Sequence, residues 1–240
     1  KRNGEDSLSI ASIQPNVKLK QKWDGSIHDN LNHLLNLSQS AIDRDTNLII
    51  WPESALPVYL LQSGKQYLKR IKESLGNHST LITGIPYADF SNNNKNIYNS
   101  AVSINNKGVQ DIYHKMQLVP MAEYVPWSKT ISILGNFNLG QGNFSQGNNI
   151  VMFKKNKVQF GTVICFESTF PWIFRDYAQQ GAELMIIVTN DGWYETLPEP
   201  QQHAKQSIYR AIETRRPIIR CANTGVSMVI DQSGNILKEL

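Results

Sequence analysis

The stretch Phe160-Gly161-Thr162-Val163-Ile164-Cys165-Phe166-Glu167 determines how this sequence is interpreted. Its first five residues form an apolar run that is typical of a buried strand. The run ends abruptly in a thiol, Cys165, and a carboxylate, Glu167. A thiol at the tip of a buried strand indicates a nucleophile, whereas a lone cysteine inside an apolar strand is usually core filler. Other segments of the chain have to decide between these two interpretations.

Strand-like and helix-like runs alternate along the chain. Polar turn sequences at residues 105–108 and 231–235 predict hairpins. Helical spacing of apolar residues predicts helices over residues 27–42, 64–75, 169–180 and 201–215. Short apolar runs predict strands over residues 8–14, 47–51, 80–85, 98–104, 108–113, 150–153, 158–165, 183–189, 217–222 and 226–231. The alternation predicts a layered α/β fold.

Length and composition limit the organisation of the chain. A chain of 240 residues with 40% hydrophobic content can bury one substantial core, and no linker or composition shift marks a second domain. We therefore predict a single domain over residues 1–240, with its catalytic core at about 7–240. No apolar stretch approaches the roughly 20 residues that span a bilayer, so the chain by itself is expected to be soluble.

Charge and cysteine content exclude several kinds of partner. The net charge is only +4 and the basic residues are scattered among acidic ones, which argues against a nucleic-acid partner. The two cysteines, Cys165 and Cys221, lie in apolar runs without Cys or His at metal-ligand spacing. We therefore predict no metal site and no cofactor.

Two other segments supply the groups that a nucleophilic thiol needs. A free thiol has a pKa near 8.5, so it requires a base or a neighbouring positive charge. Glu53 follows the apolar run 47–51 and is predicted to be the general base, while Lys115 ends the run 108–113 and could stabilise an oxyanion. Taken alone, Glu53 could be a carboxylate at the start of a helix, and Lys115 could be a solvated cation at the end of a strand. Together with Cys165 they predict an acyl-transfer site.

Further carboxylates lie near these three residues in the sequence. Glu123 comes eight residues after Lys115, and Glu167 comes two residues after Cys165. Several carboxylates around one lysine disfavour a free thiolate, so we expect Cys165 to lose its proton during the attack itself. Cys221 has no such neighbours and is predicted to lie in the core.

The order of these motifs resembles the Glu-Lys-Cys triad of the nitrilase, or carbon-nitrogen hydrolase, superfamily. Within it, the closer resemblance is to the apolipoprotein N-acyltransferase family and covers nearly the whole chain. Two departures are Phe166, where that family usually has Tyr, and Met121-Ala122, where Phe-Gly is common. The segments that carry the resemblance are 51–57, 113–126, 164–167, 190–194 and 216–225.

The resemblance implies an αββα sandwich and a two-step reaction. Cys165 would take an acyl chain from a phospholipid as a thioester and pass it to the α-amino group of a diacylglyceryl-cysteine lipoprotein. This implies work at a membrane surface, on the periplasmic face of the bacterial inner membrane. The resemblance implies catalytic roles for Glu53, Lys115 and Cys165, and supporting or substrate-binding roles for Glu123, Glu167, Phe166, Trp23, Asn190 and Trp193.

Alternatives stay open at this stage. Members of the resembled family carry membrane helices before and after this domain, so the chain is expected to be the catalytic domain of such a protein. The rival interpretation is a soluble, cytoplasmic amidase in which water resolves the same thioester. Apolar loops at 56–61, 124–134 and 193–194 could rest on a bilayer or admit acyl chains, or they could pack on the core or form a dimer interface. A binding module that had lost catalysis would lack a complete triad, whereas all three residues are present.

Overall fold

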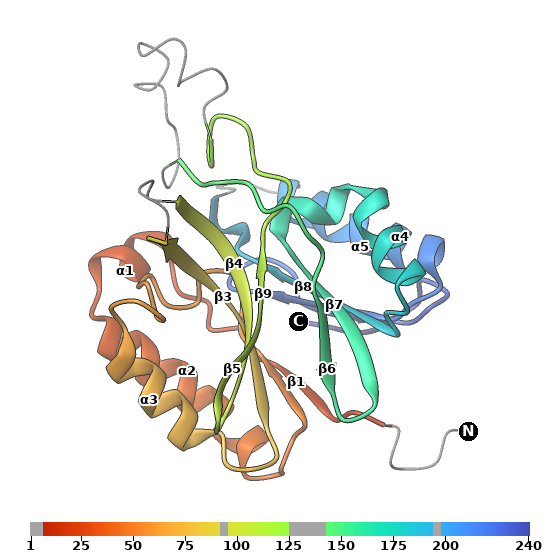
Figure 1. The fold of residues 1–240 in the computed structure, drawn as a ribbon. Helices are drawn as coiled ribbons and strands as arrows, with labels where there is room; N and C mark the ends of the chain where they lie inside the picture. The colour runs from red at the N-terminus through yellow and green to blue at the C-terminus, as the bar shows by residue number, and fades with distance from the viewer. Residues whose placement is uncertain (1–6, 92–95, 125–142, 194–197) are drawn as a thin grey trace.

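The computed structural model describes residues 7–91, 96–124, 143–193 and 198–240. In this part of the chain two β-sheets pack face to face, and helices cover the outer surface of each sheet (Figure 1). The predicted α/β layering, helix–sheet–sheet–helix, is confirmed.

The first sheet has the order β1-β2-β3-β4-β5. Strands β1, β2 and β3 are parallel, and β3, β4 and β5 form an antiparallel meander. It contains β1 (Ile10–Ser12), β2 (Leu48–Ile50), β3 (Thr80–Asp89), β4 (Asn96–Asn105) and β5 (Gly108–His114), and its helices are α1 (Leu19–Asp24), α2 (Ile27–Ile42) and α3 (Lys65–Ser74).

The second sheet has the order β11-β10-β9-β8-β7-β6. Strands β7, β8 and β9 are parallel, and the outer strands pair antiparallel. It contains β6 (Met152–Lys155), β7 (Val158–Ile164), β8 (Leu184–Thr189), β9 (Ile218–Ala222), β10 (Met228–Ile230) and β11 (Ile236–Glu239). Its helices are α4 (Pro171–Gln179) and α5 (Glu199–Thr214), with the short 3-10 helices η3 (Cys165–Thr169) and η4 (Asp191–Trp193) at strand ends.

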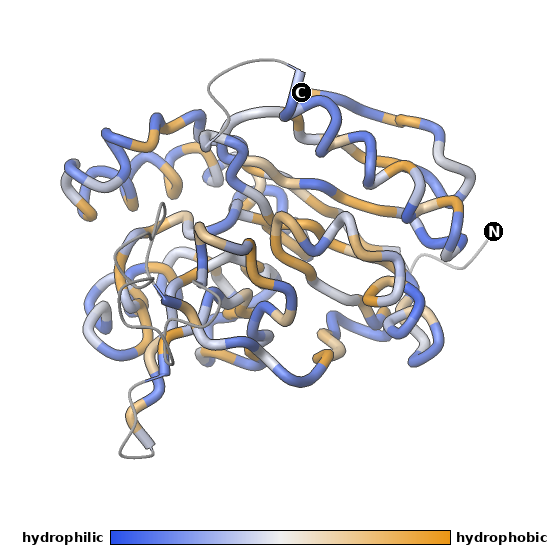
Figure 2. The backbone as a smooth tube through the Cα atoms, turned by 90° about the horizontal axis from the view of Figure 1, so that it is seen from above, coloured by the Kyte–Doolittle hydropathy of each residue, from blue (hydrophilic) through white to orange (hydrophobic). Residues whose placement is uncertain are grey.

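Alternation along the strands of the first sheet produces the layers. Leu48 and Ile50 of β2 face the second sheet, whereas Ile49 between them faces α2 and contributes to the core beneath Leu31 and Leu34. Figure 2 shows the hydrophobic residues concentrated along the strands, with hydrophilic residues spaced along the helices that flank them. Helices α2, α4 and α5 therefore each bury one face against the core.

The sequence-based elements all have counterparts in the structure, which adds α1 and β11 and differs at the ends of the others. Each predicted strand overlaps an observed one, and both predicted hairpins are present between β4 and β5 and between β10 and β11. The strand predicted over 80–85 continues to Asp89 through Pro86. Proline is tolerated there because β2 pairs with β3 only as far as Ile82, which leaves the later residues on an open edge.

The described residues contain no helix that combines the length and the apolar character needed to cross a bilayer.

Candidate active site

The three predicted catalytic residues lie at the carboxyl ends of three strands. Lys115 directly follows β5, Cys165 directly follows β7, and Glu53 comes three residues after β2. Strands β2 and β5 run in the same direction in the first sheet, and the packing of the two sheets brings the end of β7 alongside them. The structure therefore brings Glu53, Lys115 and Cys165 together, close enough for both charged groups to shift the pKa of the thiol.

Glu53 is held by donors from both sheets. Its side chain is almost fully buried, and its Oε2 accepts a hydrogen bond from the backbone N–H of Asn190, at 3.0 Å. Its Oε1 accepts from Asn99 Nδ2 at 2.8 Å. The same Asn99 nitrogen donates to Glu123 Oε1 at 2.9 Å, so one amide ties the two carboxylates together. These bonds fix the orientation of the base before substrate arrives.

Lys115 lies between two carboxylates. Its Nζ is 2.8 Å from Glu123 Oε1 and 3.8 Å from Glu53 Oε1, so the salt link expected with Glu53 is longer than the one with Glu123. Burial by itself would lower the pKa of Lys115, but the two carboxylates outweigh it and raise that pKa above its usual range. Lys115 is therefore a permanent cation, suited to stabilising an oxyanion.

Cys165 starts the 3-10 helix η3 rather than ending strand β7. Its backbone is left-handed, with φ of 51°. Burial and the nearby Glu53 carboxylate raise the pKa of its thiol to about 12, against the opposing effect of Lys115. The thiol is thus neutral at physiological pH, which supports deprotonation by Glu53 during the attack.

Glu167 is fully buried and its carboxylate is occupied by the protein itself. It accepts hydrogen bonds from the backbone N–H groups of Ile164 (2.8 Å), Met116 (2.7 Å) and Gln117 (3.1 Å) and from the Tyr113 hydroxyl (2.6 Å). These partners tie the Cys165 turn to the segment after Lys115. Both carboxylate oxygens are thus bound by the protein, an arrangement suited to a supporting role, and the expectation that Glu167 lines the site stays a prediction.

The remaining predicted site residues lie around the triad. Glu123 is confirmed as a neighbour of Lys115, and its Oε2 accepts from the Val119 N–H at 2.8 Å. Phe166 packs edge-on against Phe170, with ring centroids 5.1 Å apart. Trp193, in η4, is 46% exposed, and its role in binding stays a prediction.

A mostly apolar pocket of about 140 Å³ is lined in part by Ser54, the residue that follows Glu53. Trp23, which is 45% exposed, forms one wall, and its place near a substrate entrance stays a prediction. In the loop 56–61, Leu56 and Leu60 are buried in the core, whereas residues 57–59 line the pocket. The loop predicted at 124–134 lies outside the described residues, apart from Tyr124. The lining consists of Trp23, Ser54, Pro57, Val58, Tyr59, Pro86, Ile97, Asn143 and Phe144.

Lys22 is a site residue that the sequence analysis missed. Its side chain is only 2% exposed, and its Nζ donates to the backbone carbonyl of Glu53 at 3.1 Å. Burial lowers the pKa of Lys22 to about 8, although the Glu53 carboxylate acts in the opposite direction. A lysine in a short polar segment normally points to solvent, so its only sequence signal is the neighbouring Trp23.

A buried polar group beneath Cys165 was also missed. It joins His203 of α5 to Asp191 of η4 at 3.0 Å, and Asp191 to Arg220 of β9 at 2.7 Å. His203 Nε2 lies 3.2 Å from the Cys165 carbonyl oxygen. Cys221, by contrast, is fully buried in the core as predicted.

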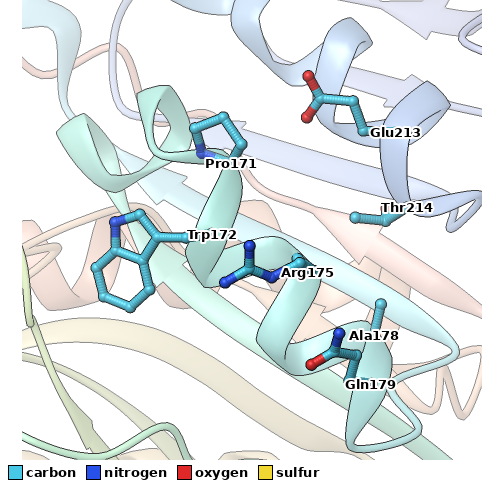
Figure 3. Close-up of a pocket in the computed structure, with 7 residues that line it drawn as sticks. All are labelled: Pro171, Trp172, Arg175, Ala178, Gln179, Glu213 and Thr214. Atoms are coloured by element: carbon cyan, nitrogen blue, oxygen red, sulfur yellow. The ribbon is translucent and has the colours of Figure 1, made fainter.

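A larger hollow of about 400 Å³ lies away from the triad, on α4 and the end of α5 (Figure 3). None of the predicted site residues lines it. Among the described residues, no group of three or more His, Cys, Asp or Glu side chains is placed to hold a metal ion.

Proteins of known name are similar to this chain in sequence or in fold. An apolipoprotein N-acyltransferase of Geobacter metallireducens is 34% identical over 97% of this chain and 45% of its own length. The chain thus spans about half the length of the curated relatives that it matches. A branch 10 nitrilase-superfamily protein of Saccharomyces cerevisiae has the same fold, with a TM-score of 0.72 at 20% identity over 97% of this chain and 85% of that one. An amidase from Nesterenkonia sp. also matches, with a TM-score of 0.63 at 18% identity over 97% and 84% of the two chains.

The nitrilase-like architecture predicted from the motifs is therefore confirmed by solved structures. Residues 9–240 match the model of the family described as carbon-nitrogen hydrolase. This range contains all of the site residues described above. The chain belongs to the carbon-nitrogen hydrolase family.

Proposed function

We propose that this chain is the catalytic part of an apolipoprotein N-acyltransferase, which moves a fatty acyl chain from a phospholipid to the N-terminal amine of a diacylglyceryl-cysteine lipoprotein. The observation that carries the proposal is the mostly apolar pocket with Trp23 in its wall, which is lined by Ser54, the residue that follows Glu53 of the buried Glu53–Lys115–Cys165 site. The names of the curated relatives support it.

The first half-reaction follows from the geometry of the three residues. Glu53 accepts the proton of the Cys165 thiol as the sulfur attacks the ester carbonyl carbon of the acyl donor. The negative charge that develops on the carbonyl oxygen faces the permanent Lys115 cation. When the intermediate collapses, the carbon–oxygen ester bond breaks, the leaving alkoxide takes the proton from Glu53, and a Cys165 thioester remains.

The second half-reaction uses the same groups in reverse. The acceptor amine attacks the thioester carbonyl carbon, and Glu53 takes a proton from the nitrogen. The carbon–sulfur bond then breaks, the thiol regains a proton, and the acyl chain leaves as an amide. One carboxylate thus serves both steps, which suits a base held by three independent protein contacts, from Asn99, Asn190 and Lys115.

Exposed apolar residues near this end of the sheets support a membrane-surface location for the acyl donor. Trp23 lies in α1, and Phe90, Met121 and Trp193 follow the ends of β3, β5 and β8, with exposed fractions of 45%, 62%, 36% and 46%. Large apolar side chains around a site mouth are suited to the interfacial region of a bilayer. We propose that this rim faces the periplasmic surface of the bacterial inner membrane.

Mass spectrometry of the intact protein after incubation with phospholipid micelles tests the proposal. We expect an adduct of one acyl chain that hydroxylamine removes, and that Cys165→Ala and Glu53→Gln lack. The rival function is a soluble amidase, whose fold this chain shares. Turnover of small amides without a lipid-derived adduct would favour that amidase and contradict the acyltransferase.

A further inference from the structure

Cys165 adopts a backbone conformation that the surrounding protein has to maintain. Its φ of 51° is left-handed, and residues other than glycine keep this conformation only where their neighbours hold it. The direction of the thiol depends on this conformation, because the side chain leaves the same Cα atom. A contact on the Cys165 carbonyl therefore bears directly on the position of the sulfur.

That contact comes from a residue far away in the sequence. His203 Nε2 lies 3.2 Å from the Cys165 carbonyl oxygen and 3.0 Å from the Ser168 hydroxyl. His203 belongs to helix α5, and it is 7% exposed, so no solvent route competes for the ring. The histidine is the only residue of α5 for which the described structure shows a hydrogen bond to Cys165.

The other edge of the ring is fixed by a buried ion pair. His203 Nδ1 lies 3.0 Å from Asp191 Oδ1, and Arg220 Nη2 donates to both Asp191 oxygens, at 3.0 and 2.7 Å. Asp191 and Arg220 are almost fully buried, and Arg220 holds the pKa of the Asp191 carboxyl low together with His203 itself, against the effect of burial. Asp191 therefore stays an anion that orients the ring.

The same carboxylate reaches the nucleophile by a second route. The Thr189 hydroxyl donates to Asp191 Oδ1 at 3.1 Å and lies close enough to the Cys165 thiol to affect its pKa. Asp191 is thus connected to the sulfur through Thr189 and to the carbonyl through His203. A buried polar group without a hydrogen-bond partner costs free energy, so such groups are kept in a core only where partners surround them. His203, Asp191 and Thr189 meet this condition next to Cys165.

We propose that His203 is a positioning residue for the nucleophile, which binds the Cys165 carbonyl and the Asp191–Arg220 pair at once and so fixes the left-handed turn that aims the thiol at Glu53. It acts through the backbone and touches no substrate. The proposal rests on the proposed function only in taking Cys165 as the nucleophile.

The two contacts of the His203 ring can be separated by a pair of variants. The Cys165 carbonyl only accepts, so its contact with residue 203 requires a donor at the place of Nε2, while the Asp191–Arg220 pair lies at the place of Nδ1. In His203→Gln the side-chain amide reaches the place of Nε2 and can still donate to the Cys165 carbonyl. In His203→Asn the shorter amide reaches the place of Nδ1, keeps Asp191, and loses Cys165. The two variants have the same chemistry and differ in which contact survives.

The test measures the rate at which iodoacetamide alkylates Cys165 at pH 7, followed by intact mass, with Cys165→Ala as the blank. We expect His203→Gln to react within about threefold of the wild type and His203→Asn to react at least about tenfold more slowly, since misplacing a reacting atom by about 1 Å can cost ~10²-fold. Circular dichroism and thermal unfolding establish that each variant is folded. His203→Met, which fills the space without a donor, replaces the Asn variant with the same expectation if the latter does not fold.

Equal rates in the Gln and Asn variants would overturn the proposal. So would a Ser168→Ala variant that reacts as slowly as His203→Asn, because the effect would then come from local packing and not from the Cys165 contact. The lipid-derived acyl adduct is measured in parallel. If the wild type forms no adduct while the alkylation difference persists, the proposed function fails and the positioning role stands. If the adduct forms and the variants do not differ, the opposite holds.

Discussion

The Lys22 ammonium group donates a hydrogen bond to the backbone carbonyl of Glu53 across 3.1 Å, in a place where the lysine is 2% exposed. The cation therefore lies beneath the general base and not in solvent. The Glu53 carboxylate attracts it, but burial has the larger effect on its pKa. A buried charge that is incompletely compensated lowers stability, and such residues are concentrated at functional sites.

Lys22→Met is expected to make the protein more stable and less active. The pKa of Lys22 falls from 10.5 to about 8 on folding, which corresponds to about 3 kcal/mol of lost stability at pH 7. The variant loses one hydrogen bond to Glu53, worth about 1 kcal/mol, so we expect the free energy of unfolding to rise by about 2 kcal/mol. Urea unfolding at pH 7 measures it. Lys69→Met, at a position that is 77% exposed, is the control and should change stability by less than about 0.5 kcal/mol.

The pH dependence of stability gives a separate check on Lys22. Between pH 8 and pH 10.5 the folded protein has lost this proton while the unfolded chain still binds it, so the Lys22 contribution to stability rises with pH in this window. Below pH 8 both states bind the proton and the full cost is present. We expect the rise to be smaller in Lys22→Met, by about 1 kcal/mol or more between pH 8 and pH 10. Parallel curves for the wild type and the variant would contradict the burial of an ionisable lysine.

Glu53→Gln is expected to make the Cys165 thiol easier to ionise while stopping the reaction. The Glu53 carboxylate helps to raise the pKa of Cys165 to about 12, so removing its charge should lower that pKa. Acyl transfer should still fall by about 10²-fold or more, because the general base is lost. Titration of the thiolate ultraviolet absorbance measures the pKa, after subtraction of the signal of Cys165→Ala, since Cys221 also has a pKa of about 12. A pKa that stays unchanged or rises would refute the electrostatic coupling.

Asn99→Asp is expected to disrupt the link between the two carboxylates. Asn99 Nδ2 donates to Glu53 Oε1 and to Glu123 Oε1, and a carboxylate in its place adds a third negative charge around Lys115. We expect the free energy of unfolding at pH 7 to fall by about 2–4 kcal/mol and the rate of acyl-adduct formation to fall by about 10-fold or more. Chemical denaturation and intact mass measure the two effects. Asn36→Asp, at an exposed position of helix α2, is the matched control and should behave like the wild type in both assays.

Gly84→Ala is expected to displace the general base. A Cβ atom at position 84 would lie 2.6 Å from Glu53 Cα and 2.7 Å from the Ser54 nitrogen, which are backbone atoms that cannot swing aside. We expect acyl-adduct formation to fall by at least about 10²-fold, because the carboxylate would be shifted by a good part of an ångström. Gly76→Ala meets no atom within 4 Å but has φ of +61°, so it should cost about 1 kcal/mol of stability and leave activity unchanged. Equal activity in the two variants would show that the loop after β2 adapts.

Strand positions could be predicted because they depend on neighbours in the sequence. The run Leu48-Ile49-Ile50 is buried on both faces, and an uninterrupted apolar run of this kind indicates a strand without reference to its partners. Helix α1 was missed because its six residues are mostly polar and have no side-chain cap at their start. The end of β7 was placed one residue late, because the left-handed turn at Cys165 is imposed by its surroundings and a cysteine gives no local signal for it.

The sequence by itself determined the layered α/β fold and predicted a site of Glu53, Lys115 and Cys165, since apolar periodicity and the groups that end each strand are local properties. Only the tertiary structure decided which carboxylate pairs closely with Lys115, that the protein itself binds the Glu167 carboxylate, and that Lys22 and His203 contact Glu53 and Cys165. These features depend on burial and on contacts between residues that are far apart in the sequence. Lys22 and Glu53 are separated by 31 positions, and His203 and Cys165 by 38. The physical reason is that desolvation and Coulomb energies vary with distance in space, which the order of residues does not specify before the two sheets pack together.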